Sequence, residues 1–298
     1  MRQVVSLELK KAFRTKGFYI ALMVGLLISL YHTVWIYRNV YAPNNVEYEK
    51  VTELGEMDKE YGYWYEIGVL DGWLGTELLS PCNQLFYLLL PFLAVLPYGS
   101  QLFSEWNNGY AGQMIIRCGR RRYLTARGIA AFVSGGCVIA IPLLVNFLSI
   151  ACFMPIIGTD PMALQSVVPG RALLGDIVYE APALYAAWYI FIDFIYGGLF
   201  ALMALAITQF CYNRFVLMIL PLMFNCCMYY GIHNLIPDIN AYNISLIPNP
   251  AQQGMKLTWH SLFLSMSGMF LILIVLFAAS NYKKLSLIHI SEPTRLQL

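Results

Sequence analysis

Six long apolar stretches constrain this chain more than any other feature of its sequence. A helix needs about 20 mostly apolar residues to cross a lipid bilayer. Stretches of this kind lie at residues 17–36, 84–103, 128–153, 183–210, 215–235 and 261–280. Hydrophobic residues make up 59% of the chain and charged residues only 12%, so a soluble domain of this length could not hide the apolar surface. The sequence therefore predicts an all-α, polytopic membrane protein whose six transmembrane helices form a single domain over residues 1–284.

The distribution of Lys and Arg predicts how the bundle is oriented. Thirteen of the 19 basic residues lie before the first stretch, between the second and third, between the fourth and fifth, or shortly after the sixth. Basic residues concentrate in the cytoplasmic loops of membrane proteins. We therefore expect both termini in the cytoplasm, in a multi-pass protein of a plasma membrane, and we expect that membrane to be bacterial.

Residues 37–83 form a long predicted outer loop that is rich in acidic and aromatic residues. We expect a solvated loop whose aromatic side chains sit at the headgroup level of the membrane. A gate or a receptor surface is the alternative interpretation.

The two end segments are predicted separately. The start, MRQVVSLELKKAFRTK, has no signal-peptide cleavage site, and its apolar residues recur at helical spacing. We expect a retained helix at the membrane surface with Lys10, Lys11 and Arg14 on its polar side. Residues 285–298 resemble translated sequencing-adapter sequence, and we expect them to be non-native.

Five arginines fall within the thirteen residues of IIRCGRRRYLTAR, which lies between the second and third stretches. The longer segment 102–136 that contains it begins as the second stretch ends, and the third stretch follows the arginines with scarcely a break. Its apolar residues and glycines predict one short helix along the cytoplasmic face of the bundle.

Motifs for chemistry within the chain are missing. The sequence contains no G-x-x-x-x-G-K-[ST] phosphate loop, and no Ser-His-Asp or Cys-His arrangement has supporting context. The seven cysteines are odd in number and most lie in apolar runs, which favours small buried residues over disulfides. We therefore expect no enzyme activity and no cofactor in this chain.

Asp193 is the clearest polar anomaly, because it lies well inside the fourth stretch. An ionisable side chain there costs several kcal/mol unless a partner or water satisfies it. One interpretation is an Asp that is hydrogen-bonded to neighbouring groups, and the other is a residue that lines a substrate path. Gly197 and Gly198, one turn later, permit close helix packing and so favour the bundle interior for this face.

Three histidines, His32, His233 and His260, fall toward the outer ends of their stretches. They suggest a haem- or metal-binding redox protein as one alternative function. No two of them are spaced i, i+4 on one helix, and isolated histidines at such positions are commonly interfacial side chains. We therefore expect no metal site.

The order of these features resembles the permease subunits of ABC transporters of the type-2 exporter class. The similarity is carried by LELKKAFRTKGFYIALMVGLLISL near the start and by LFSEWNNGYAGQMIIRCGRRRYLTARGIAAFVSGG, residues 102–136, together with the six-stretch layout. It covers roughly residues 7–30 and 102–135. The outer loop of roughly 45 residues departs from simpler members of the class.

The resemblance implies that two cytosolic ABC ATPase subunits bind ATP and that the permease pairs with a second copy or a paralogue to export a substrate. It also implies that the loop after the second stretch is the helix that docks on the ATPase. The residues that match this loop are Glu105, Gly109, Gly112, Arg117, Arg120 and Arg121, and Lys10, Lys11 and Arg14 match the leading helix.

One other role for the arginines stays open and a second is excluded. The open role is to set topology by attracting anionic membrane lipids, with each arginine contributing about 1 kcal/mol. Nucleic-acid binding is excluded as a function, because thirteen residues held between two spans cannot form a groove-tracking surface.

An ATP-independent transporter or sensor that uses Asp193 as a proton or ion site is the remaining alternative function of the whole chain.

Overall fold

The computed structural model describes residues 2–45, 67–78, 80–158, 173–208, 213–232, 235, 237–251 and 257–291. Within these residues the regular structure is entirely helical and no strand occurs, which confirms the predicted all-α class. The α-helices are α1 (Arg2–Phe13), α2 (Lys16–Ile36), α4 (Val69–Gly72), α5 (Pro81–Asn107), α6 (Tyr110–Cys118), α7 (Arg120–Ala151), α8 (Gly175–Glu180), α9 (Pro182–Ile207), α10 (Arg214–Cys226) and α12 (Trp259–Ser291). Two π-helices, η1 (Tyr37–Tyr41) and η2 (Cys227–Ile232), and one 3-10 helix, η3 (Pro237–Tyr242), complete the set.

Five helical segments are long and apolar enough to cross a membrane. They are Lys16–Asn45, Pro81–Gly99, Arg120–Ala151, Pro182–Ile207 and Trp259–Phe277. The predicted fifth stretch, 215–235, forms a shorter apolar helix, Phe215–Gly231, within α10 and η2. Five candidate spans are therefore present in the described residues, and a sixth crossing stays a prediction.

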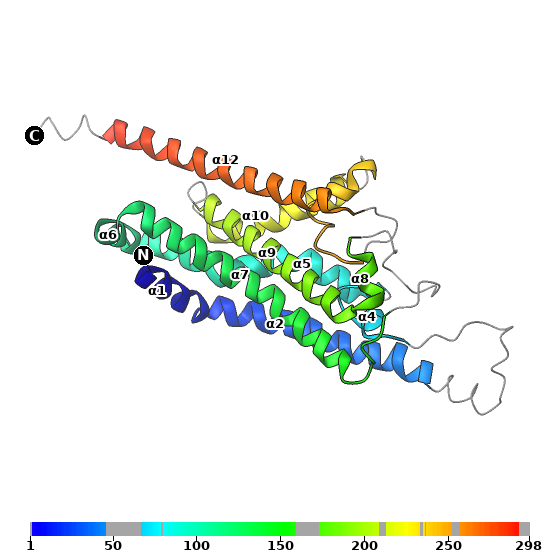
Figure 1. The fold of residues 1–298 in the computed structure, drawn as a ribbon. Coiled ribbons are helices and arrows are strands. Elements are labelled where there is room, and N and C mark those ends of the chain that lie inside the picture. Colours follow the sequence, from blue (N-terminus) through cyan, green and yellow to red (C-terminus); the bar gives the residue numbers. More distant parts are fainter. Residues whose placement is uncertain are drawn as a thin grey trace, which may run out of the picture.

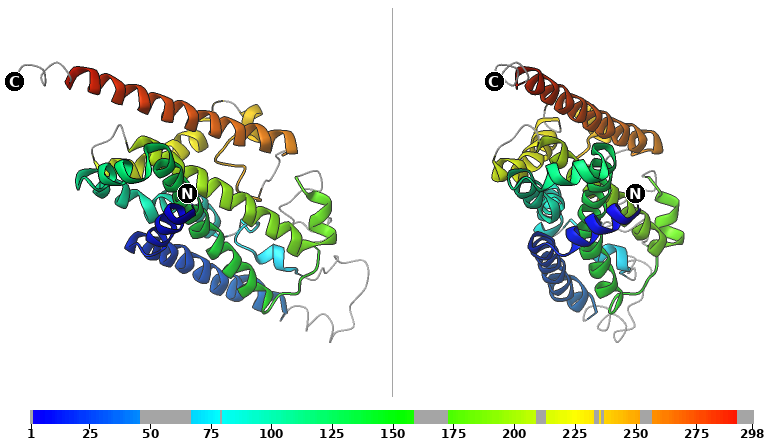
Figure 2. Two further views of the ribbon diagram at one scale, coloured as in Figure 1. Left: turned by 60° about the vertical axis from the view of Figure 1, so that its left-hand side comes forward. Right: turned by 90° about the vertical axis from the view of Figure 1, so that its left-hand side faces the viewer.

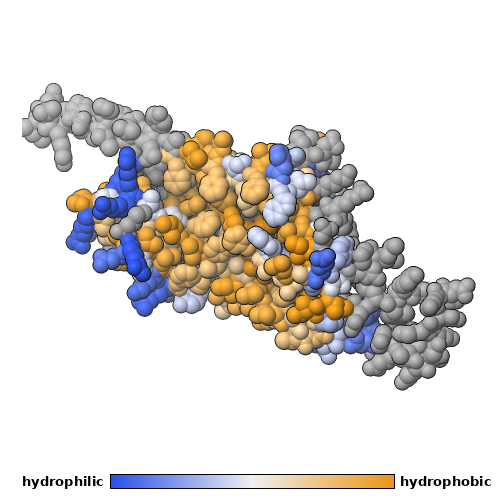
Figure 3. All heavy atoms as spheres, viewed as in Figure 1, coloured by the Kyte–Doolittle hydropathy of each residue, from blue (hydrophilic) through white to orange (hydrophobic). Residues whose placement is uncertain are grey.

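The spans form a bundle with two chemically different kinds of surface. Helices α1 and α6 lie at one end, and α4 and α8 lie at the other (Figure 1). The two further views show α1 crossing beside the start of α2 and the bundle (Figure 2). Apolar side chains cover the middle of the visible face, and strongly hydrophilic ones gather at the end where α1 and α6 lie (Figure 3). An apolar band between polar ends is the surface expected for a protein that sits in a bilayer.

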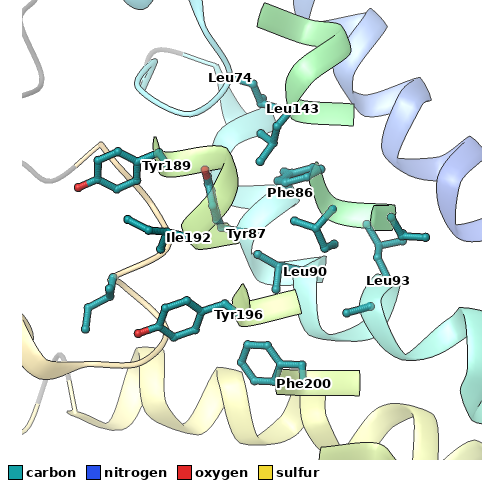
Figure 4. Packing of buried hydrophobic residues seen from close by; sticks show 14 of the residues in the cluster. Leu74, Phe86, Tyr87, Leu90, Leu93, Leu143, Tyr189, Ile192, Tyr196 and Phe200 are labelled. Atoms are coloured by element: carbon teal, nitrogen blue, oxygen red, sulfur yellow. The ribbon is translucent and has the colours of Figure 1, made fainter. Parts of the chain in front are cut away.

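The centre of the bundle is built on α7 and α9, and α7 also packs against α1, α2 and α5. Glycines bring α7 and α9 together, because a Cβ atom on Gly135 would lie 2.6 Å from the Cβ of Ala201 and 3.1 Å from the carbonyl oxygen of Gly197. Figure 4 shows the neighbouring core, in which Tyr87 and Phe86 of α5 lie among aliphatic side chains and the tyrosines of α9.

Thr15 joins α1 to α2 and both to α5. Its hydroxyl oxygen accepts a hydrogen bond from the Phe18 amide at 3.2 Å, which caps the start of α2. The hydroxyl also lies 2.8 Å from the carbonyl oxygens of Ala12 and Pro97, either of which it can donate to. A Cβ atom on Gly17 would lie 2.2 Å from the carbonyl oxygen of Leu96, so only glycine allows this approach.

The predicted surface loop 37–83 needs a correction at its C-terminal part. Residues 46–66 lie outside the described residues, but residues 67–77 pack into the bundle instead of lying on the membrane surface. Trp73 is fully buried, and its indole Nε1 donates to the carbonyl oxygen of Leu143 at 3.3 Å. Its ring also meets Phe147 edge-on. The aromatic residue was expected to anchor the loop at the headgroups, and it instead anchors the loop to α7.

Candidate functional site

Four ionisable side chains meet at the end of the bundle where α1 and α6 lie. Glu8 and Lys11 come from α1, Glu105 from α5 and Arg127 from α7; we call these four residues the charged cluster. The Lys11 Nζ lies 3.4 Å from Oε1 of Glu8 and 3.2 Å from Oε1 of Glu105. The Arg127 Nη2 lies 3.2 Å from Oε2 of Glu105. Two acids and two bases thus balance in charge and join three helices.

Helical spacing explains why α1 and α7 contribute in pairs. Glu8 and Lys11 are separated by three residues, and Tyr123 and Arg127 by four, so each pair lies on one face of its helix. The Tyr123 hydroxyl donates to Oε2 of Glu105 at 3.1 Å. Glu105 therefore receives contacts from both helices at once.

Arg127 is the most deeply buried base of the cluster, with 1% of its surface exposed. Its guanidinium carbon lies 5.0 Å from the ring centroid of Tyr123 and 5.8 Å from that of Tyr98, within cation–π range. None of its buried guanidinium nitrogens makes a hydrogen bond within the described part of the chain. The ion pair with Glu105 and the aromatic faces hold the charge in place.

Tyrosines of α5 and α6 complete the cluster. The Tyr98 hydroxyl donates to Oε2 of the fully buried Glu8. The Lys11 Nζ donates to the Tyr110 hydroxyl at 2.8 Å, which ties α1 to the first residue of α6. Burial opposes the charged amine, but the Tyr110 hydrogen bond and the nearby carboxylates of Glu105 and Glu8 outweigh it and raise the pKa of Lys11.

The predicted short helix is present as α6, set between two glycines with left-handed backbone. Gly109 has a φ of 71° and Gly119 a φ of 81°, values that residues with a side chain rarely adopt. One side of the helix packs on the bundle through the buried Ala111, while Ile116 is 87% exposed. A large aliphatic side chain so exposed at the polar end of the bundle is a candidate contact for another protein.

The residues predicted for the docking loop and for the leading interfacial helix divide into two groups. Glu105 and Lys11 turn inward and belong to the charged cluster. The other members are exposed: Lys10, Arg14, Gly109, Gly112, Arg117, Arg120 and Arg121. Arg117 lies in the last turn of α6, whereas Arg120, Arg121 and Arg122 lie in the first turn of α7. The third span was predicted to begin at residue 128, but the helix of this candidate span begins at Arg120, so most of these arginines project from the candidate span itself.

A second buried polar network lies at the opposite end, where α4 packs. The Nε2 of His32 lies 3.1 Å from Oε2 of Glu77, and its Nδ1 lies 3.2 Å from the amide nitrogen of Asn146. The Asn146 side-chain oxygen accepts from the Leu74 backbone amide at 2.8 Å. His32, Glu77 and Asn146, which we call the histidine network, are all buried. The network fixes the loop after α4 against α2 and α7.

Two acids near this end have displaced pKa values. Burial works to raise the pKa of Glu77, but hydrogen bonds from His32 and Ser80 and the charge of His32 outweigh it and lower that pKa. Burial raises the pKa of Asp71 to about 6, partly offset by the hydrogen bond from the Gly68 amide. The surroundings of Glu77 thus favour its charged carboxylate, whereas the surroundings of Asp71 disfavour the charged form.

The histidines do not come together as ligands within the described residues. His32 is committed to Glu77 and Asn146, and the exposed His260 makes an edge-on ring contact with Tyr242. His233 lies outside the described residues. In the part of the chain that the structure describes, no group of three or more His, Cys, Asp or Glu side chains is placed to hold a metal ion.

Asp193 is completely buried on α9, among tyrosines. Its Oδ2 accepts a hydrogen bond from the Tyr87 hydroxyl at 3.3 Å. Its Oδ1 is buried and has no hydrogen-bond partner among the described residues. The single hydrogen bond satisfies only part of the acceptor capacity of a carboxylate.

Sequence reasoning missed most members of these sites. In the charged cluster and around it, Glu8 and the three tyrosines were not singled out, and Arg127 was read only as one more cytoplasmic base. In the histidine network, Glu77 and Asn146 were not singled out. The spacing of Glu8 from Lys11 and of Tyr123 from Arg127 was the available signal.

Comparison with protein families, with curated proteins and with solved structures finds no match to this chain. The resemblance to type-2 exporter permeases therefore stays a prediction that rests on the residues themselves.

Proposed function

We propose that this chain is the membrane-spanning permease subunit of an ATP-driven ABC exporter. In this role it couples ATP hydrolysis by separate cytosolic ATPase subunits to outward movement of a substrate across a bacterial plasma membrane. The chain itself would carry no nucleotide site and would pair with a second copy or a paralogous permease. Anionic lipids would surround its basic end.

The observation that carries the proposal is the placement of α6. This helix is short, exposes Ile116 and Arg117, and lies between the candidate spans α5 and α7 at the basic end of the bundle. An aliphatic side chain flanked by arginines has the chemistry of an interface anchor with a charged rim.

The charged cluster supplies a route from that surface into the bundle. Lys11 contacts Tyr110 at the start of α6 as well as Glu105 of α5, and Glu105 contacts Arg127 of α7. Force applied to α6 would therefore reach three helices through paired charges. A partner that moves α6 would move the ends of the spans with it.

The test is ATPase stimulation in a reconstituted complex. The chain is co-expressed with a candidate P-loop ATPase of ABC type, purified into nanodiscs, and assayed for permease-dependent ATP hydrolysis. We expect Ile116→Asp and the triple variant Arg117→Ala, Arg120→Ala, Arg121→Ala to lower stimulation at least tenfold, since each removes part of the proposed interface.

The matched control is Arg38→Ala, which removes an exposed arginine from η1 near the far end of α2. This variant should stimulate the ATPase as the unaltered chain does. Unchanged stimulation in both α6 variants would contradict the proposal, as would a chain that never co-purifies with an ATPase.

A second candidate function rests on the buried carboxylate of Asp193. An ATP-independent transporter could use this residue as a proton or ion site. It predicts transport that survives a Walker-motif mutation in any partner ATPase and is lost in Asp193→Asn. Transport that stops with the Walker-motif mutation would eliminate this candidate.

A further inference from the structure

A pocket of about 290 Å³ lies between α5, the end of α10 with η2, and the loop that follows η3. Its described lining is Pro81, Gln84, Leu85, Tyr87, Leu88, Asn225, Tyr229, Tyr230, Ser245, Leu246 and Asn249. The volume is close to the lower limit of typical small-molecule sites. Neither the charged cluster nor the histidine network contributes to it.

The walls of the pocket are held in place by polar contacts. The Asn249 amide donates to Oδ1 of Asn83 at 2.8 Å, which fastens the loop to α5. The Ser245 hydroxyl donates to the carbonyl oxygen of Asn225 at 3.0 Å, which fastens the same loop to α10. Tyr229 and Tyr230 come from a π-helix, a departure from regular helix that is frequent at functional sites. The loop that forms one wall of the pocket is therefore fixed to α5 and α10.

The chemistry of the lining favours a positive ligand. Tyr87, Tyr229 and Tyr230 offer aromatic rings with negative faces, and the Tyr229 and Tyr230 rings meet edge-on at 4.9 Å. The amides of Gln84 and Asn225 bring side-chain oxygens, which are hydrogen-bond acceptors. Among the described lining residues none is basic.

A buried acid contacts one of the tyrosines that line the pocket. Tyr87 lines the pocket, and its hydroxyl donates to Asp193, whose second oxygen is buried and without a hydrogen-bond partner in the described part of the chain. A buried carboxylate is stabilised by a positive charge nearby, because little water is there to solvate it. Tyr87 thus links the cavity to the least compensated acid described in the bundle.

We propose that this pocket binds a small organic ammonium ion, with the cation against the faces of Tyr87, Tyr229 and Tyr230 and with Asp193 as its counter-charge. Aromatic rings arranged around a cation are the established way to hold quaternary ammonium groups. The inference goes beyond the proposed function, since binding needs neither ATP nor a partner.

The experiment measures binding of tritiated benzyltrimethylammonium to the purified full chain in nanodiscs by equilibrium dialysis. Unlabelled benzyltrimethylammonium should displace the label, and neopentylbenzene, in which carbon replaces the charged nitrogen, should not. Equal displacement by the neutral molecule would overturn the proposal, because the cavity would then be merely apolar.

Variants locate the site. Asp193→Asn keeps the shape of the side chain and removes its charge, and we expect it to weaken binding about tenfold or more. Tyr229→Leu should weaken binding roughly threefold to tenfold through loss of an aromatic face. Tyr31→Leu, which alters an exposed tyrosine on α2, is the matched control and should leave binding unchanged.

Unaltered affinity in folded Asp193→Asn, verified by circular dichroism, would overturn the proposal. If that variant does not fold, Tyr229→Leu and the neutral competitor decide the question. Failure here would leave the α6 proposal standing, because the ATPase test uses different residues and a different readout.

Discussion

The two ends of the bundle both contain buried charge, but they use it differently. In the charged cluster, Lys11 is partly exposed and is continuous with the exposed face of α6. In the histidine network, His32 and Glu77 are shut off from solvent, and their hydrogen bonds end within the loop and α2 or α7. The charged cluster connects the exposed surface of α6 to the bundle, whereas the histidine network holds the loop after α4 against the bundle. We therefore expect changes at the first end to affect coupling to a partner, in some cases together with stability, and changes at the second end to affect stability alone.

The largest loss of stability is expected from Arg127→Met. Removing one partner of a buried ion pair costs up to about 3–5 kcal/mol, because the other charge loses compensation. Glu105 would retain only Lys11 and the Tyr123 hydroxyl. The free energy of unfolding in mixed micelles, followed by far-UV circular dichroism, measures the effect.

A double variant sharpens this result. Glu105→Gln combined with Arg127→Met removes both charges. The double variant should therefore lose less free energy of unfolding than the sum of the losses in the two single variants. Additive losses would show that the two side chains do not interact as the structure has them.

A smaller loss, about 1–3 kcal/mol, is expected from Glu77→Gln, because it weakens the hydrogen bonds to His32 and Ser80. The pKa of Glu77 is lowered by folding, so the stabilisation from its carboxylate is present above the pKa of the unfolded chain and is lost as pH falls through the lower folded value. The glutamine variant should therefore lose less stability on acidification than the unaltered chain. ATPase stimulation should remain intact, and its loss would break the contrast between the two ends.

Asp71→Asn should raise the free energy of unfolding at neutral pH, whereas Glu77→Gln lowers it. Burial raises the pKa of Asp71 to about 6, so the carboxylate is charged and unfavourable in the folded state above that pH. Relative to the unaltered chain, the free energy of unfolding of the variant should be higher at pH 7 than at pH 4 by about 1–2 kcal/mol. The same unfolding measurement at both pH values checks this. A pH-independent difference between variant and unaltered chain would contradict this account of Asp71.

The smallest change in stability is expected from the exposed arginines. Alanine at Arg117, Arg120 or Arg121 should shift the free energy of unfolding by no more than about 0.5 kcal/mol each, as is usual for exposed positions. The same substitutions are expected to lower ATPase stimulation at least tenfold when combined. A large loss of stability would mean that these arginines belong to the fold and not to an interface.

The helical class and five candidate spans could be predicted because long apolar runs are a local signal. The start of α7 at Arg120 could not, since the helix continues out of the apolar region and its arginines carry no apolar signal. The burial of Trp73 was missed because an aromatic residue at a membrane surface and one packed on a span look alike in sequence.

The candidate site was only partly predictable for a related reason. Glu105 was named from the family resemblance and Lys11 from the helical spacing of the first residues, but their contact joins residues 94 positions apart. Tyr98 and Glu8 are similarly separated by 90 positions. No spacing rule reports on contacts at such distances, so the charged cluster became visible only once the helices were placed.

The contacts of Lys11 also have a consequence for the order in which the protein is made. Its amine leaves the ribosome 94 residues ahead of Glu105 and 99 ahead of Tyr110. At ordinary rates of synthesis this is a delay of about 5–20 s, during which α1 has none of its later partners. The contacts of the N-terminal helix with α5, α6 and α7 can therefore form only after those helices have been synthesised.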